Sequence, residues 1–194
     1  EEEIMFPPYN ALQIQDILRE RAKKSFKEGS LKPGVIEKCA AYAAREHGDA
    51  RRALELLRVA GELAERKGCQ YVEIKHLDEA EDRIEKDRLL DIVSNQPKQF
   101  QLVLYAILNL AAKHQSLFTG EIYTLYEAYC KQTNVRPLTQ RRVSDIIAEL
   151  DMFGIIRAKV ISKGRYGRTR EISLAISQST IPQLKEILSK SMTI

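Results

Sequence analysis

The C-terminal half of the chain takes its fold from residues 139–177, which read TQRRVSDIIAELDMFGIIRAKVISKGRYGRTREISLAIS. Thr139 is of a residue type that caps helices, and the positions after it predict a helix from Gln140 to Phe153. That helix would bury one apolar face, formed by Val143, Ile146, Ile147 and Leu150. The β-branched run Ile155–Ser162 then predicts a strand, and the alternation in Glu171–Ser177 predicts its partner, with Ile172, Leu174 and Ile176 pointing inward.

Two further helices are expected upstream of this stretch. One runs from Gln99 to Lys113, and the other runs from Gly120 to about Lys131 with Thr119 as its cap. Arg136–Leu138 predicts a short turn before the helix that begins at Gln140. The order of three helices, a strand, a loop and a strand predicts a winged helix-turn-helix domain with a two-stranded wing.

The N-terminal half predicts a small helical domain. Its four expected helices are separated by glycine-containing breaks, and they cover Leu12–Lys27, Val35–Glu46, Ala50–Lys67 and Lys75–Val93. Asp49 is the expected N-cap of the third helix. Ser94–Pro97 is the expected linker, so the sequence predicts a mainly α fold class with domains at 1–95 and 96–194.

Charge is divided unequally between these two halves. Residues 1–95 hold 17 Lys and Arg against 20 Asp and Glu, a net charge of −3, whereas residues 96–194 hold 14 against 7, a net charge of +7. A basic domain beside an acidic one indicates a polyanionic partner for the basic domain. A basic surface that only aids solubility is the alternative, and the positions of the cations must decide between the two.

The helix expected at residues 140–153 is the first element that could bind DNA. With its apolar face inward, its N-terminal polar residues face outward, and the candidate DNA-binding residues are Thr139, Gln140, Arg141, Arg142 and Ser144. In the major groove, Gln can pair with adenine and Arg with guanine. An ordinary solvated helix face would show the same pattern.

The expected wing loop, Lys163–Arg170, is the second element. Four of its eight residues are cationic and none is acidic, and residues 155–170 hold six Lys and Arg with no Asp or Glu. Its glycines allow the backbone to approach a phosphate closely, and Arg is attracted by a narrow minor groove. The alternative is a solvated charged turn. The candidate DNA-binding residues are Lys163, Gly164, Arg165, Tyr166, Arg168 and Arg170.

Several classes of protein are disfavoured by the remaining residues. The three cysteines and three histidines are scattered and lack metal-ligand or catalytic spacing, so neither a metal site nor a catalytic residue is predicted. No signal peptide or membrane-spanning run is recognised, and we expect a cytoplasmic, nucleoid-associated protein. The sequence begins with Glu1 instead of Met, and we expect it to be a piece of a longer protein.

The most specific string in the chain is Gly48-Asp49-Ala50-Arg51, which resembles the sensor-2 motif of AAA+ ATPase lid domains. Upstream, Phe6–Tyr9 and Ile17–Ala22 resemble the entry to such a lid, and the winged helix with Leu138–Ser144 follows downstream. This order resembles the archaeal replication initiators, which are relatives of the eukaryotic origin recognition complex and its cell-division-cycle loader protein. The resemblance covers essentially all 194 residues.

The resemblance implies specific roles and partners. Tyr9, Arg21 and Arg51 are similar to nucleotide-contacting positions of the intact protein, which would bind ATP or ADP with Mg; Tyr9 would touch the base and Arg51 the terminal phosphate. The winged helix would bind repeats in double-stranded origin DNA, with its helix in the major groove and its wing in the minor groove. The implied protein partners are the MCM helicase, which the family helps to recruit, and a second initiator protein on adjacent DNA.

The chain departs from that family in one large respect. No Gly-x-x-x-x-Gly-Lys-Ser/Thr occurs in the sequence, and no strand ends in an acidic metal-binding pair. Such a loop cradles the phosphates of ATP, and an acidic residue helps to hold magnesium. We therefore expect this chain to lack ATPase activity and tight nucleotide binding, and we interpret it as the lid and winged helix of an initiator without its N-terminal ATPase domain.

Two other functions fit parts of the sequence. A protein-interaction module could dock the replicative helicase through the charged helix near Lys75–Asp91. A winged-helix transcription regulator would account for residues 96–194 but would leave Gly48–Arg51 without a role. The basic wing favours DNA binding, because a protein-docking surface does not need so many cations.

Overall fold

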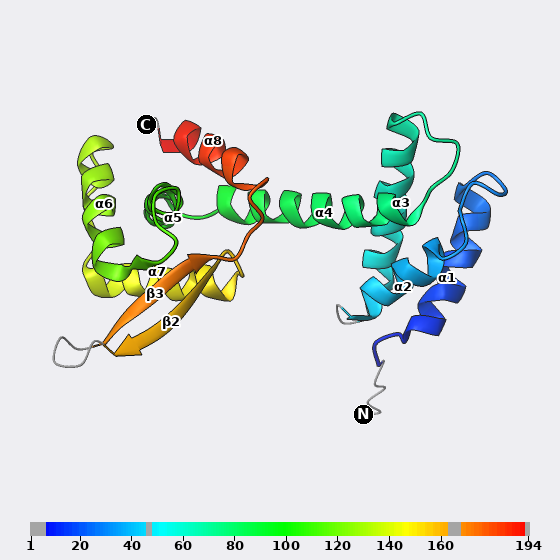
Figure 1. Cartoon of the computed structure of the whole chain (residues 1–194), viewed down its shortest axis with the longest axis horizontal. Helices are drawn as coiled ribbons and strands as arrows, with labels where there is room; N and C mark the ends of the chain where they lie inside the picture. Colours follow the sequence, from blue (N-terminus) through cyan, green and yellow to red (C-terminus); the bar gives the residue numbers. More distant parts are fainter. Residues whose placement is uncertain (1–6, 46–47, 163–167, 193–194) are drawn as a thin grey trace, which may run out of the picture. The chain divides into compact units, whose positions relative to one another are not determined.

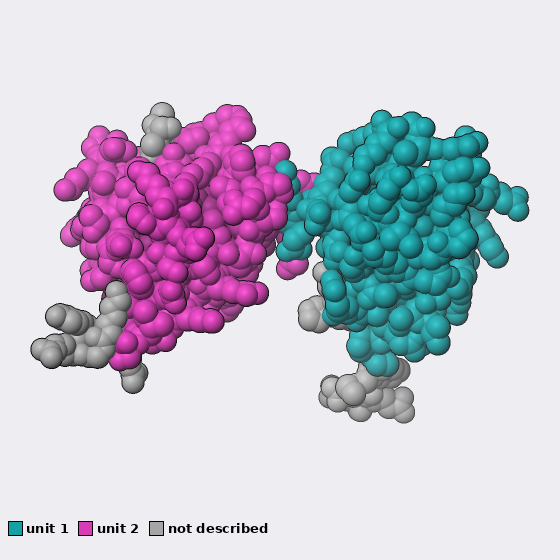
Figure 2. Space-filling model, in the orientation of Figure 1, with its two compact units in different colours: residues 1–86 teal, residues 87–194 magenta. Residues whose placement is uncertain are grey.

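A computed structural model of the chain describes residues 7–45, 48–162 and 168–192. The chain forms two compact units, residues 1–86 and residues 87–194 (Figures 1 and 2). Helices dominate both units, and the described strands form a single small antiparallel sheet in the second. The predicted mainly α fold class is therefore confirmed.

The first unit is a bundle of short helices around its own apolar core. It contains α1 (Ala11–Ser25), α2 (Val35–Arg45), α3 (Ala50–Arg66) and the first part of α4 (Ile74–Ser94). α1 packs on α2 and α3, and α2 packs on α3. Asp49 caps α3 as predicted, since its carboxylate accepts the Arg51 N–H at 2.8 Å. Asn10 caps α1 in a reciprocal pair with Gln13, a cap that the sequence analysis did not identify.

The division between the two units falls within α4. Leu77, Ala80 and Ile84 of this helix belong to the first core, whereas Leu89 and Val93 belong to the second. The sequence places the boundary at residues 95–96, whereas the compact units divide at residues 86–87. The Ser94–Pro97 segment does end the helix, but the apolar residues of α4 already contact the second core from Leu89 onward.

The second unit has the order expected of a winged helix (Figure 1). Its elements are α5 (Lys98–Ala111), β1 (Leu117–Phe118), α6 (Thr119–Gln132), α7 (Gln140–Met152), β2 (Ile156–Ser162), β3 (Arg168–Leu174) and α8 (Ile181–Met192). The nearly all-apolar α5 lies at the centre and packs against α6, α7, α8 and the sheet. α7 packs against β2, so the hairpin of β2 and β3 is attached directly to this helix.

The predicted two-stranded wing is formed by β2 and β3. β1 adds a third strand to the sheet, in the order β1-β3-β2, and was not predicted because two residues are too few to show alternation in the sequence. Two expectations for the second unit were wrong. β3 begins at Arg168 and ends at Leu174, because residues 168–170 pair with β2 although their composition is typical of a loop. Thr119 is the first residue of α6 and not its cap: the chain passes directly from β1 into the helix, and the Glu121 carboxylate accepts the Phe118 N–H.

Candidate nucleic-acid interface

The polar face of α7 is exposed at its N-terminal end. Val143, Ile147 and Leu150 are buried, so the positions between them face outward. Of the candidate residues on this helix, Gln140, Arg141 and Arg142 are exposed and Ser144 is half-buried. The face predicted to be available to DNA is therefore free of core packing.

Two of the candidates in this helix also have partners within the chain. The Thr139 hydroxyl accepts the Arg142 N–H at 3.5 Å, which confirms Thr139 as the N-cap of α7. The Arg142 guanidinium lies 3.4 Å from the Asp145 carboxylate, and both side chains are largely exposed. Such an exposed pair is weak, so Arg142 can exchange Asp145 for a phosphate at small cost.

The start of α7 is positioned by side chains from α5 and α6. The Tyr126 hydroxyl accepts the Leu138 N–H at 2.8 Å and donates to the Gln99 side chain, whose amide donates to the Arg136 carbonyl at 2.7 Å. Tyr123 adds a bond to the Leu138 carbonyl at 3.1 Å. Burial raises the pKa of Tyr126, so its hydroxyl keeps the proton that it donates. The turn before α7 is therefore held by hydrogen bonds to its backbone N–H and to its backbone carbonyl groups.

The register of the β2–β3 hairpin decides which side chains face α7. Ala158 lies opposite Ile172 and Val160 lies opposite Arg170, and residues directly opposite each other share one face of a sheet. Because Ile172 is buried, this face is the one that packs on the core. Val160 is on the same face but is 64% exposed, since the hairpin extends beyond the core at that point.

The strand pairing also changes the charge balance expected of the wing. Lys159 lies directly opposite Glu171, on the face away from the core. This acid directly follows residues 155–170, and it is the cross-strand neighbour of one of the six cations in that window. Oppositely charged neighbours across a strand pair attract each other. Lys159 is therefore partly compensated within the chain.

The loop predicted at the tip of the hairpin is described only in part. Lys163, Gly164, Arg165, Tyr166 and Gly167 lie outside the described residues. Arg168 is placed by its backbone at the start of β3. Arg170 is described fully, and its guanidinium donates to the Ser144 carbonyl of α7 at 2.7 Å.

Two exposed cations near these elements were not among the predicted site residues. Arg136 lies in the turn directly before α7, and Arg157 lies on β2. The sequence signal for Arg136 is its position three residues before the Thr139 cap, in the segment that the sequence predicts as a turn. Both side chains are exposed and are therefore accessible to a phosphate.

In the first unit, Tyr9 and the start of α3 are brought together. Gly48 has a φ of +69°, and a Cβ at this residue would overlap the Tyr9 carbonyl oxygen and lie 3.0 Å from the Pro8 side chain. Only glycine fits here, because the backbone of residues 8–9 occupies the space of a side chain. Tyr9 is 50% exposed and Arg51, in the first turn of α3, is also exposed. An aromatic ring and a guanidinium therefore lie near the same end of the unit.

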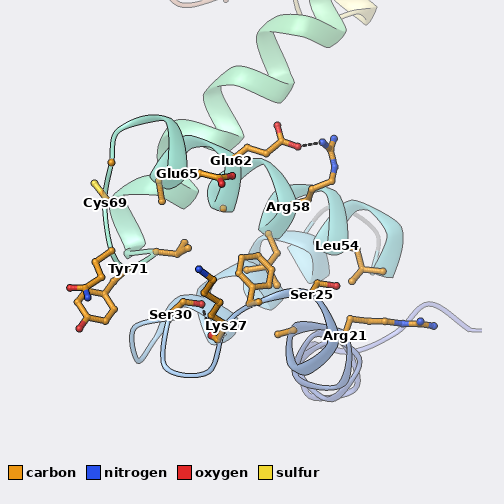
Figure 3. Close-up of a pocket in the computed structure, with 18 residues that line it drawn as sticks. Arg21, Ser25, Lys27, Ser30, Leu54, Arg58, Glu62, Glu65, Cys69 and Tyr71 are labelled. Atoms are coloured by element: carbon orange, nitrogen blue, oxygen red, sulfur yellow. Dashed lines mark hydrogen bonds and ion pairs between the residues drawn. The ribbon is translucent and has the colours of Figure 1, made fainter.

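Arg21 lies beside a groove of about 880 Å³ that is bordered by α1, α3 and residues 68–72. Leu54, one helical turn beyond Arg51, borders the same groove. Figure 3 shows the Arg21 guanidinium at one end of the groove and directed away from it, while the paired Arg58 and Glu62 lie along α3. Tyr9 and Arg51 do not line this groove.

The described residues also bear on metal sites, membrane spans and reactive thiols. No group of three His, Cys, Asp or Glu side chains within residues 7–45, 48–162 and 168–192 could hold a metal ion. None of the helices described has both the length and the apolar character needed to cross a membrane. Cys39 and Cys130 are buried and Cys69 is exposed, and burial raises the pKa of Cys39 to about 12. A buried thiol of this kind is protonated and unreactive.

Comparison with known protein families assigns both units. Residues 15–82 match the family described as the Cdc6 AAA+ ATPase-type lid domain. Residues 91–183 match the family described as CDC6, C terminal winged helix domain. The two matched segments follow the same order as the two compact units.

Individual relatives match along the whole chain. The chain is 50% identical over 201 residues to the ORC1-type DNA replication protein of Thermococcus onnurineus, covering 100% of the chain and 48% of the relative. It is 54% identical over 178 residues to that of Thermococcus kodakarensis, covering 91% of the chain and 43% of the relative. Among solved structures, the Aeropyrum pernix ORC1 protein in complex with DNA shares 46% identity and a TM-score of 0.83, covering 100% of this chain and 50% of that one. The chain thus spans about half the length of the curated relatives it matches.

Proposed function

The chain belongs to the Orc1/Cdc6-type family of archaeal replication initiators, and from this premise we propose that its second unit binds double-stranded DNA at replication-origin repeats. In this proposal, the N-terminal end of α7 enters the major groove and the β2–β3 hairpin enters the adjacent minor groove. Gln140, Arg141 and Ser144 would contact base edges. Arg142 and the wing residues Lys163, Gly164, Arg165, Tyr166 and Arg168 would contact the backbone or the minor groove.

The observation that carries the proposal is the exposed N-terminal end of α7 beside an attached basic hairpin. Gln140 and Arg141 are exposed where a recognition helix meets base edges, and the turn before them is fixed by Tyr126 and Gln99. Residues 96–194 carry a net charge of +7. The similar Aeropyrum pernix ORC1 protein was solved in complex with DNA, which supports the same kind of ligand for this chain.

A footprinting experiment tests both halves of the proposal. The chain is mixed with an origin-repeat duplex and with a random duplex of equal length across a salt series. We expect protection of the origin repeats at salt concentrations where the random duplex is no longer protected. If neither duplex is protected, DNA binding is contradicted. If both are protected equally, base reading by α7 is contradicted.

A variant separates base reading from backbone binding. Gln140→Ala should change which sequence is preferred, with a loss of about 1–3 kcal/mol of discrimination at a single base position. The slope of log affinity against log salt should stay the same, because no phosphate contact is removed. An unchanged sequence preference would remove Gln140 from the recognition surface.

A second proposal concerns the intact protein, which would bind ATP or ADP with Mg. Tyr9 would stack on the base, and Arg51 and Arg21 would contact phosphates, with Arg51 at the terminal one. The exposed ring of Tyr9 and the exposed cationic side chain of Arg51 suit the base and the phosphates of such a ligand, and the ATPase domain of the intact protein would supply the magnesium ligands. In the intact protein, Arg51→Ala should lower ATP hydrolysis while duplex binding by α7 and the wing is retained. Unchanged hydrolysis would contradict the role of Arg51.

Two protein partners of the intact initiator are proposed from family membership. These are the MCM helicase, which it would recruit, and a second initiator protein bound to adjacent DNA. Co-sedimentation of the intact protein with purified MCM, with and without origin DNA, tests the first partner. Footprints on duplexes with one or two repeats test the second, since cooperative protection is expected only with two.

A further inference from the structure

Arg170 differs from the other candidate DNA-binding residues that the structure describes, because its guanidinium bonds to a different element of the second unit, whereas that of Arg142 pairs within its own helix. One guanidinium nitrogen donates to the Ser144 carbonyl oxygen of α7 at 2.7 Å, and the bond is partly buried. The register places Arg170 opposite Val160, on the hairpin face that packs against the core further in. The side chain therefore crosses from the wing to the recognition helix.

The Ser144 carbonyl can take this bond without loss to the helix. Ser144 is within α7, where a carbonyl normally accepts one N–H from the next turn of the same helix. A carbonyl oxygen has two lone pairs, so a second donor can be accommodated. The donor here is charged, which makes the bond stronger than one between neutral groups.

A second bond ties the same hairpin to the same helix. The Asp151 carboxylate accepts the Ala158 N–H of β2 at 3.2 Å. Ser144 and Asp151 are separated by two turns of α7, roughly 10 Å along its axis. Two ties at separate points, added to the packing of α7 against β2, restrict the angle between the helix and the hairpin more than one tie would.

We propose that Arg170 is a positioning residue that sets the angle between α7 and the wing, and that it does not contact phosphate. This inference rests on the proposed function, since the angle matters only if both elements read one duplex. A recognition helix and a wing can occupy neighbouring grooves together only if their orientation matches the duplex. If α7 and the wing cannot bind the duplex at the same time, the affinity gained by linking them is lost.

The test compares two matched substitutions, Arg170→Met and Arg168→Met, in the whole chain. Both remove one cation from β3, and Met keeps an unbranched side chain of similar length. Arg168→Met should reduce the slope of log affinity against log salt by about one, as expected for a phosphate contact. Arg170→Met should leave that slope nearly unchanged and lower the preference for origin over random duplex about tenfold, because the two elements lose their shared orientation.

Two results would overturn the proposal. One is a slope reduced by about one in Arg170→Met, which would make Arg170 a phosphate contact. The other is an unchanged preference for the origin duplex. Thermal unfolding establishes first that each variant is folded. If Arg170→Met does not fold, Arg170→Gln, which keeps a polar side chain in the strand, takes its place in the comparison.

The positioning role is also measured without DNA. Residual dipolar couplings of the free protein report the orientation of α7 relative to β2 and β3. We expect this orientation to change or to average in Arg170→Met and to stay fixed in Arg168→Met, and an unchanged orientation in Arg170→Met would overturn the proposal. If the unsubstituted chain binds no duplex, the proposed function fails, and the couplings alone decide whether Arg170 sets the angle.

Discussion

The two units use the same kinds of cationic side chain in opposite ways. In the first unit, cations join helices: Lys38 lies 2.6 Å from Asp78, Lys67 lies 2.6 Å from Glu79, and Arg45 lies 3.3 Å from Glu81. In the second unit, exposed cations such as Arg136, Arg141 and Arg157 line the elements predicted to meet DNA. The difference teaches that net charge alone does not predict a DNA surface. We expect the decisive feature to be the placement of the cations, on elements that a duplex can reach.

The largest expected effect comes from removing the wing cations together. Lys163→Ala, Arg165→Ala and Arg168→Ala combined should lower duplex affinity about 100-fold at moderate salt, because three phosphate contacts release their counterions. The slope of log affinity against log salt should fall by about three. Fluorescence anisotropy with a labelled duplex across a salt series measures both quantities.

The matched control removes three exposed cations from the first unit. Lys23→Ala, Lys24→Ala and Arg66→Ala make the same change in net charge. Affinity and slope should stay close to those of the unsubstituted chain. A comparable loss in both triple variants would show that net charge, and not the placement of cations, determines binding, and the contrast between the units would not hold.

A pair of glycines allows a second comparison between the units. Gly48 and Gly154 have φ values of +69° and +72°, but a Cβ would meet the Tyr9 backbone at Gly48 and nothing within 4 Å at Gly154. Gly154→Ala should therefore cost only the strain of the left-handed conformation, about 1–2 kcal/mol. Gly48→Ala should cost more and should displace Tyr9, because backbone atoms occupy the space needed.

Chemical denaturation of the two variants measures this difference, with Gly→Asn at each position as a further comparison. Asn tolerates the left-handed conformation, so Gly154→Asn should be nearly neutral and Gly48→Asn should not. Equal costs at both positions would mean that the contact between Gly48 and Tyr9 does not hold the N-terminal segment in place.

The smallest expected effect is a difference in acid sensitivity. The hydrogen bonds of Asp78 with Lys38 and then with Tyr42 lower the pKa of Asp78 below its usual 3.8, and the bond of Glu79 with Lys67 lowers the pKa of Glu79 below 4.5. A carboxyl with a lowered pKa in the folded state stabilises the fold above its unfolded pKa, and this contribution is lost as the pH falls through the folded value. The first unit should therefore weaken below about pH 4 before the second does.

Amide hydrogen exchange over a pH series, corrected for intrinsic rates, follows α2 and α5 separately. Protection in α2 should decrease at acid pH while protection in α5 is retained. Asp78→Asn should reduce the pH dependence of α2, because the titrating group is gone. A parallel decrease in both helices would show that these ion pairs do not distinguish the units.

Local patterns predicted most of the helices and two of their caps. Asp49 and Thr139 are short polar residues directly before amphipathic runs, and the structure uses both as caps. The Asn10 cap had an equally local signal, Gln13 three residues later, and could have been found in the same way. Features that depend on neighbours distant in sequence were missed. β1 forms only because β3 lies beside it, and the core contacts of α4 change partner within one continuous helix.

The candidate site shows the same limit. Exposure of Gln140 and Arg141 follows from helical periodicity alone, and it was predicted. The bond of Arg170 to the Ser144 carbonyl joins residues 26 positions apart, and no pattern in the sequence distinguishes Arg170 from Arg168. The DNA-binding roles of the individual side chains stay predictions until the variants are measured.

The small sheet of the second unit also has a consequence for how copies of this protein behave at high concentration. Free strand edges invite pairing with other chains and lead to aggregation. Here β1 covers the inner part of one edge of β3, and Asp151 occupies the Ala158 N–H on the outer edge of β2. Lys159 lies on that same edge strand, and a charged residue there disfavours a second strand. The inner part of each hairpin edge is therefore unavailable as a template for another copy.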